Sequence, residues 1–353
     1  MKLLLPIAGR SSRFPNMKPK WLLTHPNGNF MIDESISKMD LSVFDEIILI
    51  SLIELENNHH FSQLLAARIQ EIAGGVPCRC VLLENSTSSQ SETVAEGLRQ
   101  VGGEFSFVVK DSDNQFSYKA TEDNSIAVGD LNAVGLINAK NKSYVEVNKD
   151  KKVTNIVEKK VISNFFCVGA YSFKSSQQFL EYYDSCDKSS GELYISGLIY
   201  MMLIDGISFS TTLVKNYTDW GTLDDWDRFK SQYATLFVDI DGTLVYNSGQ
   251  FFEPKWGSTD AITENVTALG YLYDSGKVEV ILTTSRKLAF KAITEAQLDR
   301  LGIKYHQIIY GLHHSKRIII NDYARTNPFK SCDAINIKRD SSDLAEMIKE
   351  AMR

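Results

Sequence analysis

Apolar segments of strand length alternate with helical segments over the front of the chain, and this alternation restricts the fold more than any other feature. The apolar runs are Leu3–Ala8, Glu46–Leu52, Cys80–Leu83 and Phe105–Lys110, and helical patterning covers Phe61–Ile72 and Glu92–Val101. Strands that are separated by helices form βαβ units, whose parallel sheet is covered on both faces. We therefore expect an α/β fold with a Rossmann-like sheet.

The spacing of the apolar runs changes from about Ser143 onward. The next runs are Ser143–Val147, Val153–Glu158, Phe165–Phe173 and Ser208–Val214. The short connections among the first three suit antiparallel neighbours, because a parallel crossover needs about a dozen residues or more. These runs predict an antiparallel or mixed extension of the sheet.

A second apolar strand that enters a polar loop comes at Ala234–Leu244. The stretch Asp224–Tyr233 before it is polar and helix-like, as expected of a connector. The chain of 353 residues is also long enough for about two domains. We place the boundary near Gln232, which predicts one α/β domain at 1–232 and another at 233–353.

Charge and composition disfavour several classes of partner. Lys and Arg number 38 and Asp and Glu number 44, a net charge of −6, and an acidic chain lacks the positive field that nucleic acid requires. No apolar run approaches the length of about 20 residues that spans a bilayer. Five scattered cysteines indicate free thiols in a reducing compartment. We expect a cytoplasmic protein without a nucleic-acid or membrane partner.

The loop after the first strand has the residue types that hold a triphosphate. Small residues let backbone N–H groups approach phosphate oxygens, and basic side chains supply charge. Ala8, Gly9 and Ser11 are the small residues, and Arg13 and Lys20 are the basic ones. A polar surface loop is the alternative interpretation of this segment.

This segment resembles the start of the sugar-phosphate nucleotidyltransferases, in which a strand is followed by AGxGxR and then a PK pair. Ala8-Gly9, Arg13 and Pro19-Lys20 match that pattern. Ser11 stands where the family usually has a second glycine, and a small residue is tolerated there if its φ stays negative. The resemblance implies that the small residues bind the nucleotide and that the two cations stabilise the leaving pyrophosphate.

Three later segments on the nucleotide side occur in the order that the resemblance requires. Gln90, in Thr87–Val94, corresponds to the base-recognition stretch. Asp113, which follows the strand that begins at Phe107, matches the aspartate that binds the first Mg²⁺, and Asp111 is an equally reachable carboxylate. Asp219, in the sequence TDWGT, matches the second metal aspartate.

Two further segments carry the acceptor side of the resemblance. Glu158 and Lys159 resemble the pair that holds a sugar and its phosphate, and Gly191-Glu192 resembles the sugar-side segment. The implied reaction is the in-line attack of a sugar or polyol phosphate on the α-phosphorus of a nucleoside triphosphate, with CTP weakly favoured over UTP. Mg²⁺ and basic side chains neutralise the two anions in such a reaction.

The sequence LFVDIDGTLV at Leu236–Val245 carries a second kind of chemistry. An aspartate at the carboxyl end of a strand can attack phosphorus, and a second acid two residues later can move the proton. The sequence resembles motif I of the haloacid dehalogenase (HAD) superfamily of phosphatases. The resemblance implies that Asp239 is the nucleophile, that Asp241 is the acid and base, and that the domain is a HAD-like Rossmannoid.

The remaining HAD motifs are expected in order. Thr284, with Thr283 as the alternative, ends an apolar strand and would bind phosphate. Lys316 or Arg317 would be the motif III cation, directly before a third apolar strand at 318–320. Asn321 or Asp322 would complete a Mg²⁺ shell with Asp239 and the carbonyl of Asp241, although the family often has two acids there.

Only about 40 residues separate the first two HAD motifs, which leaves little or no room for a cap domain. The combined resemblance implies a bifunctional enzyme with Mg²⁺ in both domains, of the kind that makes precursors of bacterial capsule and surface polysaccharides. Two alternatives remain open. The HAD domain is catalytically silent and structural or regulatory, or the front domain only binds sugar phosphate.

Overall fold

The computed structural model describes residues 1–9, 11, 13–134, 139–187, 192–322 and 331–352. The chain divides into two compact units, Met1–Leu223 and Asp224–Arg353. The helix α7 (Leu223–Lys230) begins at this division. It covers most of the segment in which the sequence predicts a connector.

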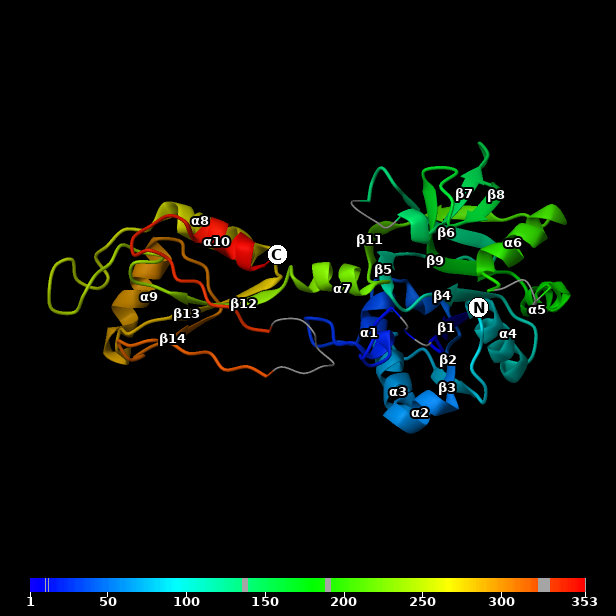
Figure 1. Ribbon diagram of the computed structural model, residues 1–353, viewed down its shortest axis with the longest axis horizontal. Coiled ribbons are helices and arrows are strands. Elements are labelled where there is room, and N and C mark those ends of the chain that lie inside the picture. The colour runs from blue at the N-terminus through cyan, green and yellow to red at the C-terminus, as the bar shows by residue number, and fades with distance from the viewer. Residues whose placement is uncertain (10, 12, 135–138, 188–191, 323–330, 353) are drawn as a thin grey trace. The chain divides into compact units, whose positions relative to one another are not determined.

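Unit 1 is built on a nine-stranded mixed sheet (Figure 1). Its main path runs β10-β6-β9-β4-β1-β2-β3, and β7 and β8 extend it from β9. The strands are β1 (Lys2–Pro6), β2 (Glu46–Leu52), β3 (Cys78–Leu83), β4 (Phe107–Lys110), β6 (Ser125–Asp130), β7 (Ser143–Val147), β8 (Val153–Glu158), β9 (Phe165–Phe173) and β10 (Ser210–Leu213). The first four are parallel, whereas β9 is antiparallel to both β4 and β6. The predicted change from a parallel to a mixed sheet is confirmed.

Helices cover both faces of this sheet. The core on one face includes side chains of α4 (Gln90–Val101), α5 (Ser176–Ser185) and α6 (Ile195–Ile204). The core on the other face includes α1 (Met31–Ile36) and α3 (Ser62–Ile72). The short helix α2 (Ile53–His59) follows β2, and three short 3-10 turns are η1 (Lys20–Leu22), η2 (Leu41–Val43) and η3 (Ala139–Asn141).

A separate two-stranded ladder of β5 (Asn114–Ser117) and β11 (Lys215–Asp219) follows the carboxyl end of β4. The two strands are antiparallel, and Asn114 is paired with Asp219. The sequence did not predict this ladder, because both strands are short and mostly polar. It brings together two segments that are about 100 positions apart in the chain.

Unit 2 contains a smaller parallel sheet in the order β12-β13-β14. Its elements are β12 (Ala234–Asp239), α8 (Thr263–Asp274), β13 (Val278–Thr283), η5 (Leu288–Phe290), α9 (Lys291–Arg300), β14 (Gln307–Ile309) and α10 (Leu344–Ala351). The core joins the strands to Leu269 of α8, Leu298 of α9 and Leu344 of α10. In the fully described stretch 240–277 between β12 and β13, α8 is the one helix or strand.

The prediction of a third strand at 318–320 in unit 2 is wrong. Ile318, Ile319 and Ile320 have no regular secondary structure and are 75%, 54% and 91% exposed. A strand needs a neighbour for its backbone groups. The residues that flank the run bond elsewhere, since Arg317 contacts Asp239 and Asn321 donates to the carbonyl of Ser331. Apolar composition alone therefore does not place this run in the sheet.

Helices long and apolar enough to cross a membrane are absent from the part of the chain that the structure describes.

At Gly97, α4 packs tightly against β2. A Cβ at this position would lie 2.4 Å from Cδ1 and 2.9 Å from Cγ1 of Ile50, which is fully buried. We expect Gly97→Ala to lower the free energy of unfolding by about 1–2 kcal/mol, because overpacking outweighs the helix propensity of alanine. Chemical unfolding measures this change.

Gly197 in α6 is the matched control. A Cβ there would lie 3.6 Å from its one near neighbour, Cδ1 of Leu193. Gly197→Ala should therefore stabilise the protein by about 0.5–1 kcal/mol. Equal effects of the two substitutions would contradict the close approach of α4 to β2.

Candidate functional site

The loop after β1 bends sharply at Ser11. Its φ is +49°, so the condition under which a serine replaces the glycine without strain, a negative φ, is not met. The Ser11 Oγ accepts a hydrogen bond from the backbone N–H of Lys20 at 3.0 Å. This contact helps to offset the cost of about 1–2 kcal/mol that a side chain incurs in the left-handed region. It also fixes the start of η1, which carries Lys20.

The two residues predicted to bind nucleotide just before this bend differ in exposure. Ala8 is 3% exposed and belongs to the core. Gly9 is exposed, and a Cβ at Gly9 would meet nothing within 4 Å. The backbone at Gly9 is therefore open to a ligand, as a phosphate-binding loop requires.

The β5–β11 ladder brings Asp113 and Asp219 together. Asp113 directly precedes β5, Asp219 ends β11, and the N–H of Trp220 donates to the carbonyl of Asp113 at 2.8 Å. A Cβ at Gly221 would lie 3.1 Å from Asp219 Oδ1 and 3.5 Å from Asp113 Oδ2. Glycine thus keeps open the space that both carboxylates face.

A lysine neutralises each of these two carboxylates. Lys20 Nζ donates to Asp113 Oδ2, and Lys142 Nζ lies 2.5 Å from Asp219 Oδ2. Burial alone would raise the pKa of Asp113, but Lys20, with Lys142 and Lys110, holds that pKa well below its usual range. Arg13 joins the group, since its Nη1 donates to the carbonyl of Gly221 at 3.3 Å.

Asp111 lies in a different environment from Asp113. Its carboxylate accepts a hydrogen bond from Nε2 of Gln90, and its backbone N–H donates to the carbonyl of Gly169 at 2.8 Å. Gly169 has φ +84°, and a Cβ there would lie 2.2 Å from Asp111 Oδ2. Burial and the charge of Asp113 raise the pKa of Asp111 to about 6. The side-chain amide of Gln90, the residue that was predicted to recognise the base, is thus hydrogen-bonded to the carboxylate of Asp111.

Sequence reasoning missed Lys110 and Lys142. The Lys110 ammonium is fully buried and donates to the carbonyls of Asp111 and Asn114 and to Oδ1 of Asn114. Burial lowers its pKa to about 8. Lys142 also donates to the hydroxyl of Tyr217 at 2.8 Å. Nothing in the sequence marks Lys142, but a lysine inside the apolar end of β4 was a signal that could have singled out Lys110.

The predicted acceptor residues belong to two sets of hydrogen-bonded side chains, one around Glu158 and one around the next residue, Lys159. Glu158 Oε2 accepts from the hydroxyls of Ser143 and Ser196, the second at 2.7 Å. Lys159 Nζ donates to the hydroxyl of Tyr194 at 2.6 Å, and that hydroxyl donates to Glu192 Oε2 at 2.6 Å. Tyr194 therefore joins two of the predicted residues. Gly191, from the same predicted segment, lies outside the described residues.

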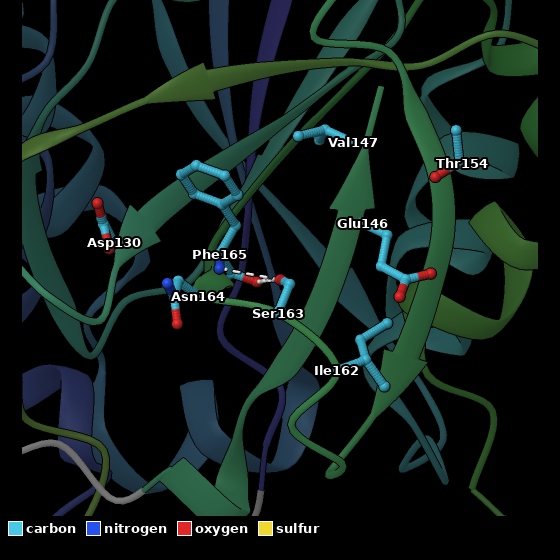
Figure 2. Close-up of a pocket in the computed structure, with 8 residues that line it drawn as sticks. All are labelled: Asp130, Glu146, Val147, Thr154, Ile162, Ser163, Asn164 and Phe165. Carbon is cyan, nitrogen blue, oxygen red and sulfur yellow. Dashed lines mark hydrogen bonds between the residues drawn. The ribbon is translucent and has the colours of Figure 1, made fainter. Parts of the chain in front are cut away.

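A pocket of about 490 Å³ opens elsewhere on unit 1, beside β7, β8 and the start of β9 (Figure 2). Its lining residues are Asp130, Glu146, Val147, Thr154, Ile162, Ser163, Asn164 and Phe165. None of the predicted site residues lines it. No lysine or arginine is among these lining residues to offset the carboxylates of Asp130 and Glu146, whereas Lys20 and Lys142 offset those of Asp113 and Asp219. We therefore place the phosphate chemistry at the site of Asp113 and Asp219.

The site of Asp113 and Asp219, called the two-aspartate site from here on, has the type of ligand that Mg²⁺ prefers. Within the described ranges no three His, Cys, Asp or Glu residues gather closely enough to hold a metal by themselves. Mg²⁺, however, is usually bound by one or two carboxylates together with waters and phosphate oxygens of the substrate. Asp113 and Asp219, which face the gap at Gly221, provide that number of ligands.

In unit 2, Asp239 ends β12 and contacts one of the two candidate cations. Arg317 Nη2 lies 3.0 Å from Asp239 Oδ1, so Arg317 and not Lys316 reaches the predicted nucleophile. Burial raises the pKa of Asp239, Arg317 lowers it, and Asp241 raises it, with a net upward shift. The exposed position of Arg317 leaves it able to contact an anion.

Asp241 is held by a buried arginine. Arg286 donates from Nε to Asp241 Oδ2 at 2.8 Å and from Nη2 to Oδ1 at 2.7 Å, while its Nη1 donates to Thr294 and Gln297. Thr284 Oγ1 accepts from the N–H of Arg286 at 3.1 Å. Thr284 was predicted to bind phosphate; in the structure the arginine two residues later, Arg286, fixes Asp241.

The C-terminal segment closes the turn that follows Asp239. Asn265, fully buried in α8, donates to the carbonyls of Thr243 and Ser341 and accepts from the N–H of Leu344. Gly242 has φ +82°, and a Cβ there would lie 2.7 Å from Cγ of Arg339. The turn of the DxDGT sequence is therefore held by residues far along the chain.

The candidate metal ligands late in unit 2 have contacts of their own. Asn321 Nδ2 donates to the carbonyl of Ser331 at 3.1 Å, and Asp322 is exposed. The Mg²⁺ shell of Asp239, the carbonyl of Asp241 and Asn321 or Asp322 stays a prediction.

The fold over about two thirds of the chain is that of sugar-phosphate nucleotidyltransferases. Similar solved structures include a nucleoside-diphosphate-sugar pyrophosphorylase from Vibrio cholerae RC9, at 22% identity over 64% of this chain and 98% of that chain with a TM-score of 0.53. Others are an inositol-1-phosphate CTP transferase from T. maritima (12% identity, 64% and 90%, TM-score 0.50) and a UDP-glucose pyrophosphorylase complexed with UDP-glucose (14%, 64% and 95%, TM-score 0.51).

The covered share is close to that of unit 1, which has 223 of the 353 residues. At these identities the likeness establishes the fold alone. No protein-family model matches the sequence, and no curated protein matches it.

The raised pKa of Asp111 predicts a pH-dependent effect of Asp111→Asn. At pH values between 3.8, the ordinary pKa of an aspartate, and about 6, the folded protein binds more protons at Asp111 than the unfolded chain does. The free energy of unfolding of the parent protein therefore falls as the pH rises through this range. The variant should be more stable than the parent by about 2 kcal/mol at pH 8. Urea unfolding at pH 4 and pH 8 measures the difference, which should disappear at pH 4. A constant difference would contradict the shift.

Loss of Arg286 should destabilise unit 2. Arg286→Met leaves Asp241 with a largely buried, unpaired charge and removes the donor to Thr294 and Gln297. We expect the free energy of unfolding of unit 2 to fall by about 3–5 kcal/mol, measured by chemical unfolding. Arg300→Met is the control, because its exposed pair with Asp260 at 3.7 Å should contribute under about 1 kcal/mol.

Proposed function

We propose that the protein transfers a nucleotidyl group from a nucleoside triphosphate to a sugar or polyol phosphate and releases pyrophosphate. The observation that carries this proposal is the pairing of β5 with β11, which sets Asp113 and Asp219 around the space at Gly221 beside Lys20 and Arg13. Two carboxylates and two cations facing one space suit the reaction of two phosphate groups.

The residues of the site divide between the two substrates. The exposed backbone at Gly9 and the cations Arg13 and Lys20 would bind the triphosphate and stabilise the pyrophosphate as it leaves. Lys159 would hold the acceptor phosphate in line with the α-phosphorus. A protein base is unnecessary, because a phosphate is already an ionised nucleophile; catalysis comes from positioning and charge.

Asp113 and Asp219 would hold Mg²⁺, which would supply positive charge against the phosphates of the two substrates. CTP is the nucleotide we favour. The fold neighbours are named for reactions with different nucleotides, one of them a CTP transferase, so the base is an experimental question. A role in making precursors of capsule or surface polysaccharides is part of this proposal by analogy.

A second activity, phosphomonoester hydrolysis in unit 2, has its own support. Asp239 lies at the carboxyl end of a parallel strand, as an aspartate nucleophile requires, and Arg317 is positioned to attract a phosphate. The pairing of Asp241 with Arg286 limits its part in proton transfer, because that carboxylate accepts two hydrogen bonds from the arginine and a third from Ser248. A structural or regulatory unit 2 is the alternative.

Activity assays of the full chain with Mg²⁺, each of four nucleoside triphosphates and a panel of sugar and polyol phosphates test both proposals. Pyrophosphate should appear with one triphosphate and one acceptor. Asp113→Ala and Asp219→Ala should each lower its rate about a hundredfold or more, whereas the exposed Asp123→Ala should not. Phosphate without pyrophosphate under every triphosphate would refute the transferase.

Inorganic phosphate, measured separately, tests unit 2. Asp239→Asn should abolish phosphate release and leave pyrophosphate release unchanged. If phosphate follows only after pyrophosphate, the nucleotide-linked product is the substrate of unit 2. Equal phosphate release by the variant and the parent would show that Asp239 is not a nucleophile.

A further inference from the structure

Lys142 connects the two halves of the proposed transferase site. It directly precedes β7, and its carbonyl accepts a hydrogen bond from the N–H of Lys159 at 3.0 Å. Its ammonium reaches in the other direction, to Asp219 Oδ2 at 2.5 Å and to the hydroxyl of Tyr217 at 2.8 Å. One residue therefore touches a candidate metal ligand and the backbone of the acceptor pair.

The ammonium of Lys142 lies on a carboxylate, that of Asp219, which a metal ion would also bind. The side chains of Lys142 and Asp219 are only 16% and 13% exposed, so water screens their attraction weakly. A divalent cation in the space at Gly221 would bind Oδ1 of Asp219, while the ammonium lies on Oδ2 of the same carboxylate. Two positive charges on one carboxylate repel each other, so binding of the cation weakens the hold of Asp219 on the ammonium.

The backbone of Lys142 lies next to that of the predicted acceptor residue Lys159. A lysine side chain is a point charge on a flexible four-carbon stem, and the backbone of Lys142 is already paired with that of Lys159. The next residue, Ser143, donates to Glu158 of the same acceptor pair. An anion held by Lys159 would therefore lie beside the strand end that also carries Lys142.

We propose that Lys142 is a phosphate ligand that is held on Asp219 until a divalent cation binds there, and that then contacts the phosphate of the acceptor. This inference rests on the proposed transferase function. It restricts the acceptor to phosphomonoesters or similar dianions, because a second ammonium beside Lys159 favours a doubly charged group.

The first test measures metal binding without substrates. Mn²⁺ is titrated into the full chain and free Mn²⁺ is followed by electron paramagnetic resonance. Lys142→Met should bind Mn²⁺ roughly fivefold more tightly than the parent, because the competing charge is gone. Lys142→Gln, which keeps a donor for Asp219, should do the same and serves if the methionine variant does not fold. Unchanged or weaker binding by folded variants would overturn the proposal.

Lys140→Met is the matched control, since Lys140 is an exposed lysine two positions earlier. It removes the same charge from the same segment without a contact to Asp219. Its Mn²⁺ affinity should equal that of the parent. Tighter binding by this control, equal to that of Lys142→Met, would assign the effect to net charge and overturn the specific role.

The second test separates the two substrates kinetically at saturating Mg²⁺. Lys142→Met should raise the KM for the acceptor phosphate about tenfold and leave the KM for the triphosphate within about twofold. An equal rise in both would overturn the assignment to the acceptor. If the parent releases no pyrophosphate with any triphosphate, the transferase proposal fails, while the Mn²⁺ titration still decides whether Lys142 competes for Asp219.

Discussion

The compensation of buried carboxylates by ammonium groups is the constraint on which the front unit depends. Asp111, Asp113 and Asp219 meet where β4 ends and β5 pairs with β11, and Lys20, Lys110 and Lys142 lie among them. A carboxylate that leaves water without a partner costs several kcal/mol. The sheet can hold these acids together only because Lys110, the neighbour of Asp111, and two lysines from other places in the chain, Lys20 and Lys142, reach the same point.

The same arrangement explains why the three acids differ. Asp113 is next to Lys20 and keeps its charge, whereas Asp111 faces an amide and the charge of its neighbour, which raises its pKa to about 6. Environments that push the pKa values of adjacent acids apart commonly mark different roles. Of the two candidates, Asp113 is therefore the one that we propose as the metal ligand.

The sequence predicted those parts of the fold that are encoded locally. β7, β8 and β9 have the predicted boundaries, because each is an apolar run between turn residues. The β5–β11 ladder, Lys142 and the Asp241–Arg286 pair were missed, because each depends on a contact between residues far apart in the chain. The failed strand at 318–320 shows the reverse case, in which a local pattern finds no partner. The residue types at strand ends thus predicted where the candidate sites lie, but they did not predict which side chains are in contact there.

The network around Asn265 has a consequence for synthesis. Unit 1 is contiguous and ends at Leu223, so its sheet can close while the rest of the chain is still being translated. The turn after Asp239 requires the carbonyl of Ser341 and the N–H of Leu344. A ribosome that makes this chain therefore holds a finished front unit while the DxDGT turn waits for residues near the end. That interval is when the strand β12 is most exposed to mispairing and to the chaperones that prevent it.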